Sequence, residues 1–170
     1  MVGLTAIINK FLMKISKKVK NFSKWALVII VIAFFIFFPK IENNFLKNRV
    51  NNINYVKIAN QIIKVELAIS QEDQIQGLSR RISLKDDEGM LFIFQKSGLN
   101  YFWMKEMNFP IDIIWINENF QVIFIQEDVQ PESFPEIFGP DEKSKYVLEI
   151  IAGFVRKNNL SVGDPIEFLP

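Results

Sequence analysis

An uninterrupted apolar run at residues 25–38, WALVIIVIAFFIFF, constrains this 170-residue chain more than any other feature. As a helix rising about 1.5 Å per residue, the run covers only about 21 Å of a hydrocarbon core that is about 30 Å thick. Extended to residues 22–41, it can span a bilayer, because Lys24 and Lys40 near its ends can reach the headgroups. The sequence therefore predicts a transmembrane anchor over residues 22–41, ended by Pro39.

Two other interpretations of the run are less consistent with its surroundings. A cleaved signal peptide would need a small-x-small site, and the following stretch, PKIENNFLKNRVNN, offers none. A core helix of a soluble domain would not be preceded by six lysines without any acidic residue. An uncleaved anchor is favoured over both.

Charge is distributed very unevenly along the chain. Residues 1–40 contain seven lysines and no acid, whereas residues 41–170 contain 13 basic and 19 acidic residues. Such an excess of lysine before the run predicts a cytoplasmic N-terminus in the cytoplasmic (inner) membrane, and a C-terminal domain outside the cytoplasm. Residues 1–21 form a basic leader, either an amphipathic helix on an anionic leaflet or simply a positive flank. Nucleic-acid binding is disfavoured because the remainder is acidic.

The part of the chain after the anchor divides into a tether and a domain. Residues 42–54 are rich in Asn and lack Gly, which is typical of a linker with little fixed structure. Residues 55–170 then show short apolar runs with period-two alternation, the pattern of strands with one buried face. Strands are expected at residues 55–59, 63–69, 90–94, 101–105, 109–116, 120–125, 146–151 and 165–168.

Few helices are expected between these strands. Ser70 and Asp73 have capping-box spacing for a short helix through Leu78, and a second short helix is expected at residues 155–157. Residues 130–141, with three Pro, predict an irregular loop. The long crossover helices of a doubly wound fold are missing. The fold class is therefore α+β, a β-dominated curled or barrel-like sheet with two short helices.

Composition excludes much of the usual site chemistry. The chain has no Cys and no His, which removes disulfides, thiolate or imidazole metal sites and every mechanism with an imidazole base. No phosphate loop or dinucleotide fingerprint is present, so no cofactor is indicated. The acidic run at residues 86–88 lacks EF-hand spacing and is better interpreted as a solvated loop than as a metal site.

Two carboxylates interrupt apolar strand faces. Asp112 shares a face with Ile114 and Ile116, and Glu149 with Val147 and Ile151. A buried carboxylate needs hydrogen bonds or a cationic partner to stay charged. The plausible partners are Arg81, Lys105 and Arg156. An internal ion pair that fixes the fold is the favoured interpretation, and a ligand-binding or catalytic role is the alternative.

An aromatic platform is the other candidate feature. Trp103 alternates with Tyr101 and Lys105 on the expected strand at residues 101–105, which would suit a sugar or an anionic organic group. A Trp in such a position is more often part of the core.

Five linked motifs resemble a known family. They are QGLSRR at 76–81, EGMLFIF at 88–94, FWMKEMNFPIDIIWI at 102–116, YVLEIIAGF at 146–154 and LSVGD at 160–164. In this order and spacing they resemble the family of domain of unknown function 192, over residues 56–168. The matching positions include Gly77, Arg81, Lys105, Asp112 and Glu149.

What the resemblance implies is a compact, mostly β domain, often exported or membrane-anchored, without an established activity. Two positions depart from the family pattern. Glu106 stands where the family usually has Asn, which adds a negative charge beside Lys105, and Ile111 replaces the usual Leu. The first departure weakens an anion-binding role for Lys105.

Three functions are compatible with these residues. The preferred one is an extracytoplasmic binding or accessory module, anchored in the membrane, that holds a small polar ligand or an envelope partner. Its ligand-binding residues would be Arg81, Trp103, Lys105, Asp112 and Glu149. The second is an envelope hydrolase that uses Asp112 and Glu149 as an acid/base pair. The third is a structural partner of another envelope protein, docking beside the loop at residues 130–141.

Overall fold

The computed structural model describes residues 26, 28–32 and 52–170 of the chain. Residues 26 and 28–32 are helical. The predicted leader, most of the predicted anchor and most of the predicted tether lie outside the described residues. No helix within the described part is long and apolar enough to cross a membrane. Residues 52–170 form a compact unit of their own.

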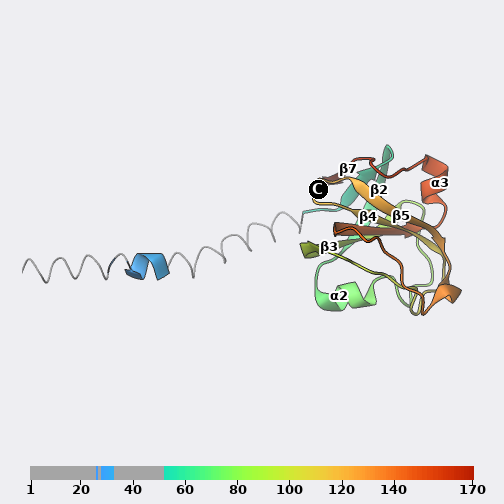
Figure 1. Cartoon of the computed structure of the whole chain (residues 1–170). Helices are drawn as coiled ribbons and strands as arrows, with labels where there is room; N and C mark the ends of the chain where they lie inside the picture. The colour runs from blue at the N-terminus through green and yellow to red at the C-terminus, as the bar shows by residue number, and fades with distance from the viewer. Residues whose placement is uncertain (1–25, 27, 33–51) are drawn as a thin grey trace, which may run out of the picture. The chain divides into compact units, whose positions relative to one another are not determined.

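Seven strands of this unit make one sheet (Figure 1). They are β1 (Tyr55–Ile58), β2 (Gln61–Ala68), β3 (Glu88–Gly98), β4 (Ile111–Ile116), β5 (Val122–Val129), β6 (Ser144–Ile151) and β7 (Ile166–Leu169). The order across the sheet is β5-β4-β6-β3-β2-β1-β7. Every pairing is antiparallel except that between β2 and β3.

Helices are short, as expected from the sequence. Helix α2 (Gln71–Gln76) follows β2 and returns the chain so that β3 can run parallel to β2 (Figure 1). Its capping box is formed as predicted: Asp73 N–H donates to Ser70 Oγ, and the Asp73 carboxylate accepts from the Ser70 backbone. Helix α3 (Phe154–Asn158) precedes β7, and a 3-10 turn, η1 (Pro131–Ser133), lies in the irregular loop.

The sheet curls until its two outer strands meet at one end. Gln121 and Pro165 form an isolated bridge between the segments that lead into β5 and β7. Nearby, Val122 N donates to the Asp164 carbonyl at 3.0 Å, and Ile166 N donates to the Phe120 carbonyl at 2.9 Å. The sequence prediction of an α+β fold with a curled, β-dominated sheet is confirmed.

Strand register assigns each buried residue to one of the two sheet faces. On one face, the central row contains Met90 of β3, Glu149 of β6 and Ile113 of β4. On the other face, the neighbouring row contains Leu91, Leu148 and Ile114. All six residues of β4 are buried, because apolar side chains cover both faces of the sheet at this strand.

One expected strand does not form. Residues 101–105 belong to a loop that makes only an isolated bridge between Phe102 and Phe138. The loop is fixed instead by the buried indole of Trp115, whose Nε1 donates to the Asn100 carbonyl at 2.7 Å. The predicted alternation of Trp103 with Tyr101 and Lys105 on a strand face is therefore wrong. The apolar residues in this loop cover the sheet rather than extend it.

Candidate functional site

Glu149 is the most unusual side chain on the sheet face that α2 and the loop at residues 99–107 cover. Its position in the middle of β6, between Met90 and Ile113, follows directly from the strand register. Only 4% of the residue is exposed. Its Oε2 atom is buried and has no hydrogen-bond partner among the described residues. Buried carboxyl oxygens are normally paired, so this one is an exception that calls for an explanation.

Burial controls the protonation of this carboxyl. Loss of hydration disfavours the charged form and raises the pKa of Glu149 to about 8, although the nearby Arg81 charge acts in the opposite direction. Near neutral pH the side chain is therefore mostly a neutral acid. It can donate one hydrogen bond through its proton and accept others.

A cavity of about 260 Å³ opens onto this carboxyl. It is bounded by residues 74–79 of α2 and the following turn, by Phe92 and Phe94 of β3, and by residues 99–103 of the covering loop. Phe92 and Phe102 pack edge to face, with ring centroids 4.8 Å apart. The result is an aromatic pocket with a single carboxyl at its base.

Gly77 explains how the chain leaves room for that carboxyl. Its φ of +50° is costly for other residues, and a Cβ atom there would lie 3.2 Å from the Phe92 ring and 3.6 Å from Glu149 Oε2. A side chain at position 77 would thus fill the space between α2 and Glu149.

Arg81 does not pair with either candidate carboxylate. It makes a bidentate ion pair with Glu66 of β2, with N–O distances of 2.5 and 2.6 Å. Glu66 pairs with Met90, and Met90 with Glu149, so these three residues lie in one row across three strands. The hydrogen bonds from Arg81 lower the pKa of the Glu66 carboxyl. The prediction that Arg81 pairs with Asp112 or Glu149 is therefore wrong, because the Arg81 guanidinium binds the Glu66 carboxylate instead.

Asp112 lies on the opposite face of the sheet. It pairs with Ile150, one residue away from Glu149, and successive residues of a strand point to opposite faces. Its Oδ1 accepts from Asp128 N at 2.8 Å, and its Oδ2 accepts from Val155 N at 2.9 Å. Asp112 and Glu149 therefore cannot form the acid/base pair of the hydrolase hypothesis, and that expectation is corrected.

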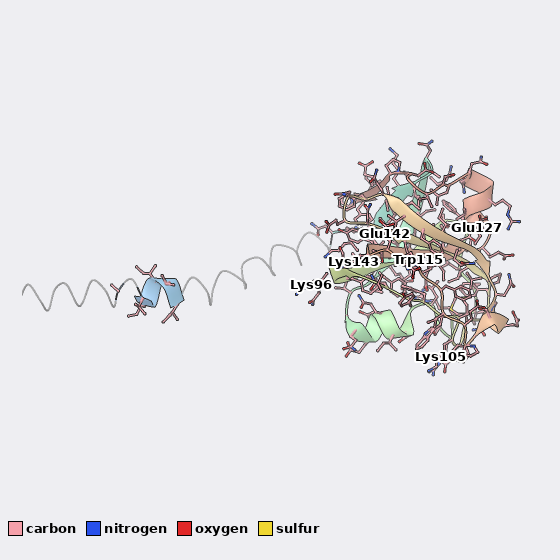
Figure 2. The ribbon with its side chains drawn as sticks, in the orientation of Figure 1. Lys96, Lys105, Trp115, Glu127, Glu142 and Lys143 are labelled. Atoms are coloured by element: carbon pink, nitrogen blue, oxygen red, sulfur yellow. The ribbon has the colours of Figure 1, made fainter. Side chains whose placement is uncertain are left out.

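Of the remaining candidates, Trp103 lines the pocket and Lys105 does not. Trp103 is 48% exposed, and its ring meets Phe134 edge to face at 6.4 Å. Lys105 is exposed at the periphery of the domain, away from the buried Trp115 (Figure 2). Next to it, Glu106 pairs with Arg80 at 2.6 Å. Of the five predicted site residues, the structure brings Glu149 and Trp103 to one pocket and places Arg81 nearby.

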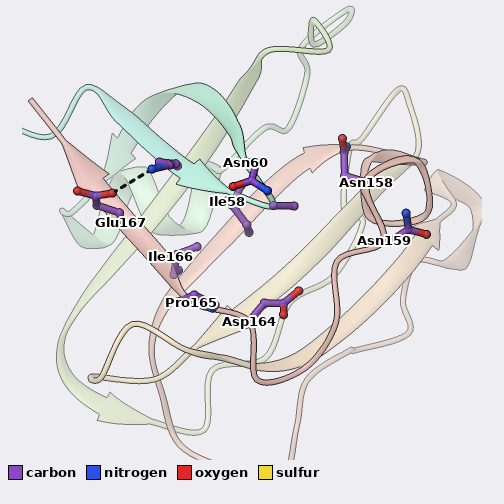
Figure 3. A pocket seen from close by; sticks show the side chains of 10 residues that line it. Ile58, Asn60, Asn158, Asn159, Asp164, Pro165, Ile166 and Glu167 are labelled. Carbon is purple, nitrogen blue, oxygen red and sulfur yellow. Dashed lines mark ion pairs between the residues drawn. The ribbon is translucent and has the colours of Figure 1, made fainter.

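A larger cavity of about 520 Å³ lies elsewhere, between the β1–β2 turn, the end of α3 and the start of β7 (Figure 3). Four of its polar side chains, those of Lys57, Asn158, Asp164 and Glu167, are already engaged within the domain. Asp164 Oδ2 accepts from Ser161 N at 2.8 Å, Asn158 donates to the Phe154 carbonyl, and Glu167 pairs with Lys57. Among the described residues, this cavity has no buried side-chain nitrogen or oxygen atom without a hydrogen-bond partner, so it is the weaker candidate.

Sequence reasoning missed several residues that shape the pocket. Glu66 was not considered, because its place beside Arg81 depends on the parallel register of β2 and β3. Leu99 lies outside the expected strand at residues 101–105 and was not considered, and Tyr101 was predicted only as a neighbour of Trp103 on a strand face. A single sequence does not show that these side chains line a pocket.

The fold and the site together define a small β-rich module with one aromatic, carboxyl-based pocket. The chain belongs to the family of domain of unknown function 192 (DUF192), described as "Uncharacterized ACR", whose family model matches residues 54–168. The resemblance inferred from the five motifs is thereby confirmed.

Two solved structures are similar to the domain. One is a protein from Sinorhizobium meliloti 1021, named as a "putative transcription regulator", with 32% identity, a TM-score of 0.63 and coverage of 67% of this chain and 90% of that one. The other is a protein of unknown function from Novosphingobium aromaticivorans, with 28% identity, a TM-score of 0.64 and coverage of 68% and 84%. No curated protein matches this chain significantly.

Proposed function

We propose that this chain is a binding module whose pocket at Glu149 holds a small organic ligand. The observation that carries the proposal is the carboxyl of Glu149, which lines a cavity and whose buried Oε2 atom has no partner among the described residues. An unpaired buried polar oxygen costs about 1–3 kcal/mol, and a ligand that hydrogen-bonds to it recovers that cost on binding. Ligand sites commonly combine apolar walls with a few such polar groups.

Trp103 and Tyr101 suit the rim of such a pocket. Both are about half exposed beside the cavity, although aromatic side chains of this size are usually buried. A ligand that covers them gains apolar contact area without any change in the core. Trp103 therefore also provides a fluorescent probe for occupancy.

A fragment screen on the full-length chain tests the proposal. The screened set contains neutral, cationic and anionic aromatic fragments, and we expect it to include binders that perturb the Trp103 indole resonance. Glu149→Gln should lower the affinity of these binders at least fivefold. Glu167→Gln, in the larger cavity, is the matched control and should leave binding unchanged. The proposal fails if no fragment binds, or if Glu149→Gln changes the affinity of the binders no more than the control substitution does.

We further propose that the module is held at the outer face of the cytoplasmic membrane by the anchor at residues 22–41. The lysine-rich residues 1–40 and the acidic remainder support this orientation. A reporter fused to the C-terminus should be active only outside the cytoplasm, and the full-length chain should resist extraction by carbonate. Activity of the reporter in the cytosol, or extraction of the chain, would exclude this location.

An envelope protein as partner is the second candidate. Phe134 and Ile137, in the loop at residues 130–141, are 44% and 60% exposed, and Phe134 meets Trp103 at the pocket rim. Their replacement by Ser should leave fragment binding intact. If these two substitutions instead disrupt a defined envelope complex that Glu149→Gln preserves, the partner function replaces the ligand function.

A further inference from the structure

The charges around the pocket determine which ligands it can accept. Among the residues that line it, the only ionisable side chains are Glu149 and Tyr101, and none is Lys or Arg. The strand neighbours of Glu149, Met90 and Ile113, are uncharged. An anionic ligand would therefore meet a carboxyl and no compensating cation inside the pocket.

The nearest guanidinium is already neutralised. Arg81 contributes a favourable charge to Glu149, but both of its terminal nitrogens are bonded to Glu66. On α2, the Asp73 carboxylate is engaged in the capping box, and Glu72 is exposed. The ionised form of Glu149 therefore has no direct cationic partner among the residues that line the pocket, and a cationic ligand would stabilise that form.

Aromatic walls strengthen this preference. Phe92, Phe102, Tyr101 and Trp103 all line the cavity, and the face of an aromatic ring attracts cations and repels anions. A cation between such rings is better stabilised than a neutral group, particularly where water is partly excluded. A volume of about 260 Å³ is below the range typical of drug-sized ligands, so the ligand is small.

We propose that the ligand of this pocket is a small organic cation, whose ammonium group donates to the carboxyl of Glu149 and whose apolar body lies against Trp103 and Tyr101. This inference rests on the proposed binding function and specifies its ligand class. Ligand binding to the ionised carboxylate must displace a proton, because burial raises the pKa of Glu149 to about 8. Apparent affinity for a cation should therefore rise about 50-fold from pH 6 to pH 8, following the ionised fraction.

Three probes of similar size separate the possibilities: phenethylamine, 2-phenylethanol and phenylacetate, each titrated into the full-length chain at pH 6, 7 and 8. We expect phenethylamine to bind at least tenfold more tightly than the other two at pH 8, with the stated pH dependence. Calorimetry in two buffers should show about one proton released per ligand at pH 7. Glu149→Gln should abolish the pH dependence, and Glu167→Gln should not.

The outcomes distinguish this inference from the function on which it rests. If 2-phenylethanol or phenylacetate binds as tightly as phenethylamine and depends on Glu149, the pocket is a binding site but not one for cations. If phenethylamine binds without proton release in the unmodified chain, the inference fails even if Glu149→Gln does not fold. If neither these probes nor any fragment binds, the binding function itself is wrong.

Discussion

Asp112 and Glu149 are two buried carboxylates on adjacent strands of one sheet, and they differ in their hydrogen bonds. Asp112 is fully buried, and each of its oxygens accepts a backbone N–H. Glu149 is almost as buried, yet its Oε2 has no partner among the described residues. Burial alone therefore does not tell a structural carboxylate from one that is available for binding. The hydrogen bonds that surround it do.

Asp112 has a clear architectural role. Asp128, which donates to Oδ1, has a φ of +51° at an irregularity in the β4–β5 register. Val155, which donates to Oδ2, lies in the first turn of α3, where Gly153 offers no side-chain cap. Asp112 thus joins a distorted strand to a helix end, and orphan N–H groups at helix starts need such acceptors. On the other face, no comparable structural role is found for Glu149 in the part of the chain that the structure describes.

The largest expected effect is on the pH dependence of stability. Because the pKa of Glu149 is raised from 4.5 to about 8 on folding, the folded state holds a proton that the unfolded state has released between these values. The free energy of unfolding therefore falls as the pH rises from 4.5 to 8, by roughly 5 kcal/mol at most, since each pKa unit corresponds to about 1.36 kcal/mol. Glu149→Gln should remove this fall, as urea unfolding at a series of pH values will show.

Carboxylates with lowered pKa values do not interfere in that window. Glu66, whose pKa is lowered by Arg81, contributes stability that is lost only as the pH falls below about 4.5. Equal slopes for the unmodified chain and for Glu149→Gln between pH 5 and pH 8 would show that the two buried carboxylates do not differ as described.

A smaller effect is expected from Asp112→Asn. An amide retains one acceptor but directs its NH₂ at the N–H of either Asp128 or Val155, so one backbone donor loses its partner. The expected cost is about 2 kcal/mol in the free energy of unfolding, measured in urea at pH 7. Asp164→Asn, at an exposed turn with one backbone bond, is the control and should cost less. A neutral Asp112→Asn would mean that Asp112 does not hold α3 and β5 together.

The smallest effect is expected from Arg81→Gln. Its pair with Glu66 is partly exposed, so the loss in the free energy of unfolding should be about 1 kcal/mol or less. The same change removes the charge that lowers the pKa of Glu149, so that pKa should rise further. Arg80→Gln, which removes the exposed pair with Glu106, is the control and should leave the Glu149 pKa unchanged. A shift of equal size in both variants would contradict the proximity of Arg81 to Glu149.

Much of the sheet could be predicted from the sequence, because alternation is a local signal. All seven strands of the sheet overlap an expected strand, and the capping box at Ser70 follows from the spacing of Ser70 and Asp73. Alternation also identified Asp112 and Glu149 as carboxylates on apolar faces. It could not show that these faces are opposite, since that depends on the register between β4 and β6, which one sequence does not reveal.

The covering loop shows the second limit of prediction from one sequence. Residues 101–105 have the composition of a strand. However, the hydrogen bond from Trp115 to the Asn100 carbonyl and the bridge between Phe102 and Phe138 hold them in a loop that covers the sheet. Tertiary contacts overrode a local preference there. The pocket depends on that loop, so its position could not be inferred before the structure, although two of its residues, Trp103 and Glu149, were already candidates.

Direct titration of the Glu149 carboxyl by carbon-13 NMR, with Glu149→Gln used to assign the resonance, tests the central claim. The structure predicts a midpoint near pH 8 in the free chain, and a downward shift when an ammonium ligand is added. A midpoint near 4.5, unaffected by ligand, would show that this carboxyl is solvated or paired, and the pocket would lose its chemical basis.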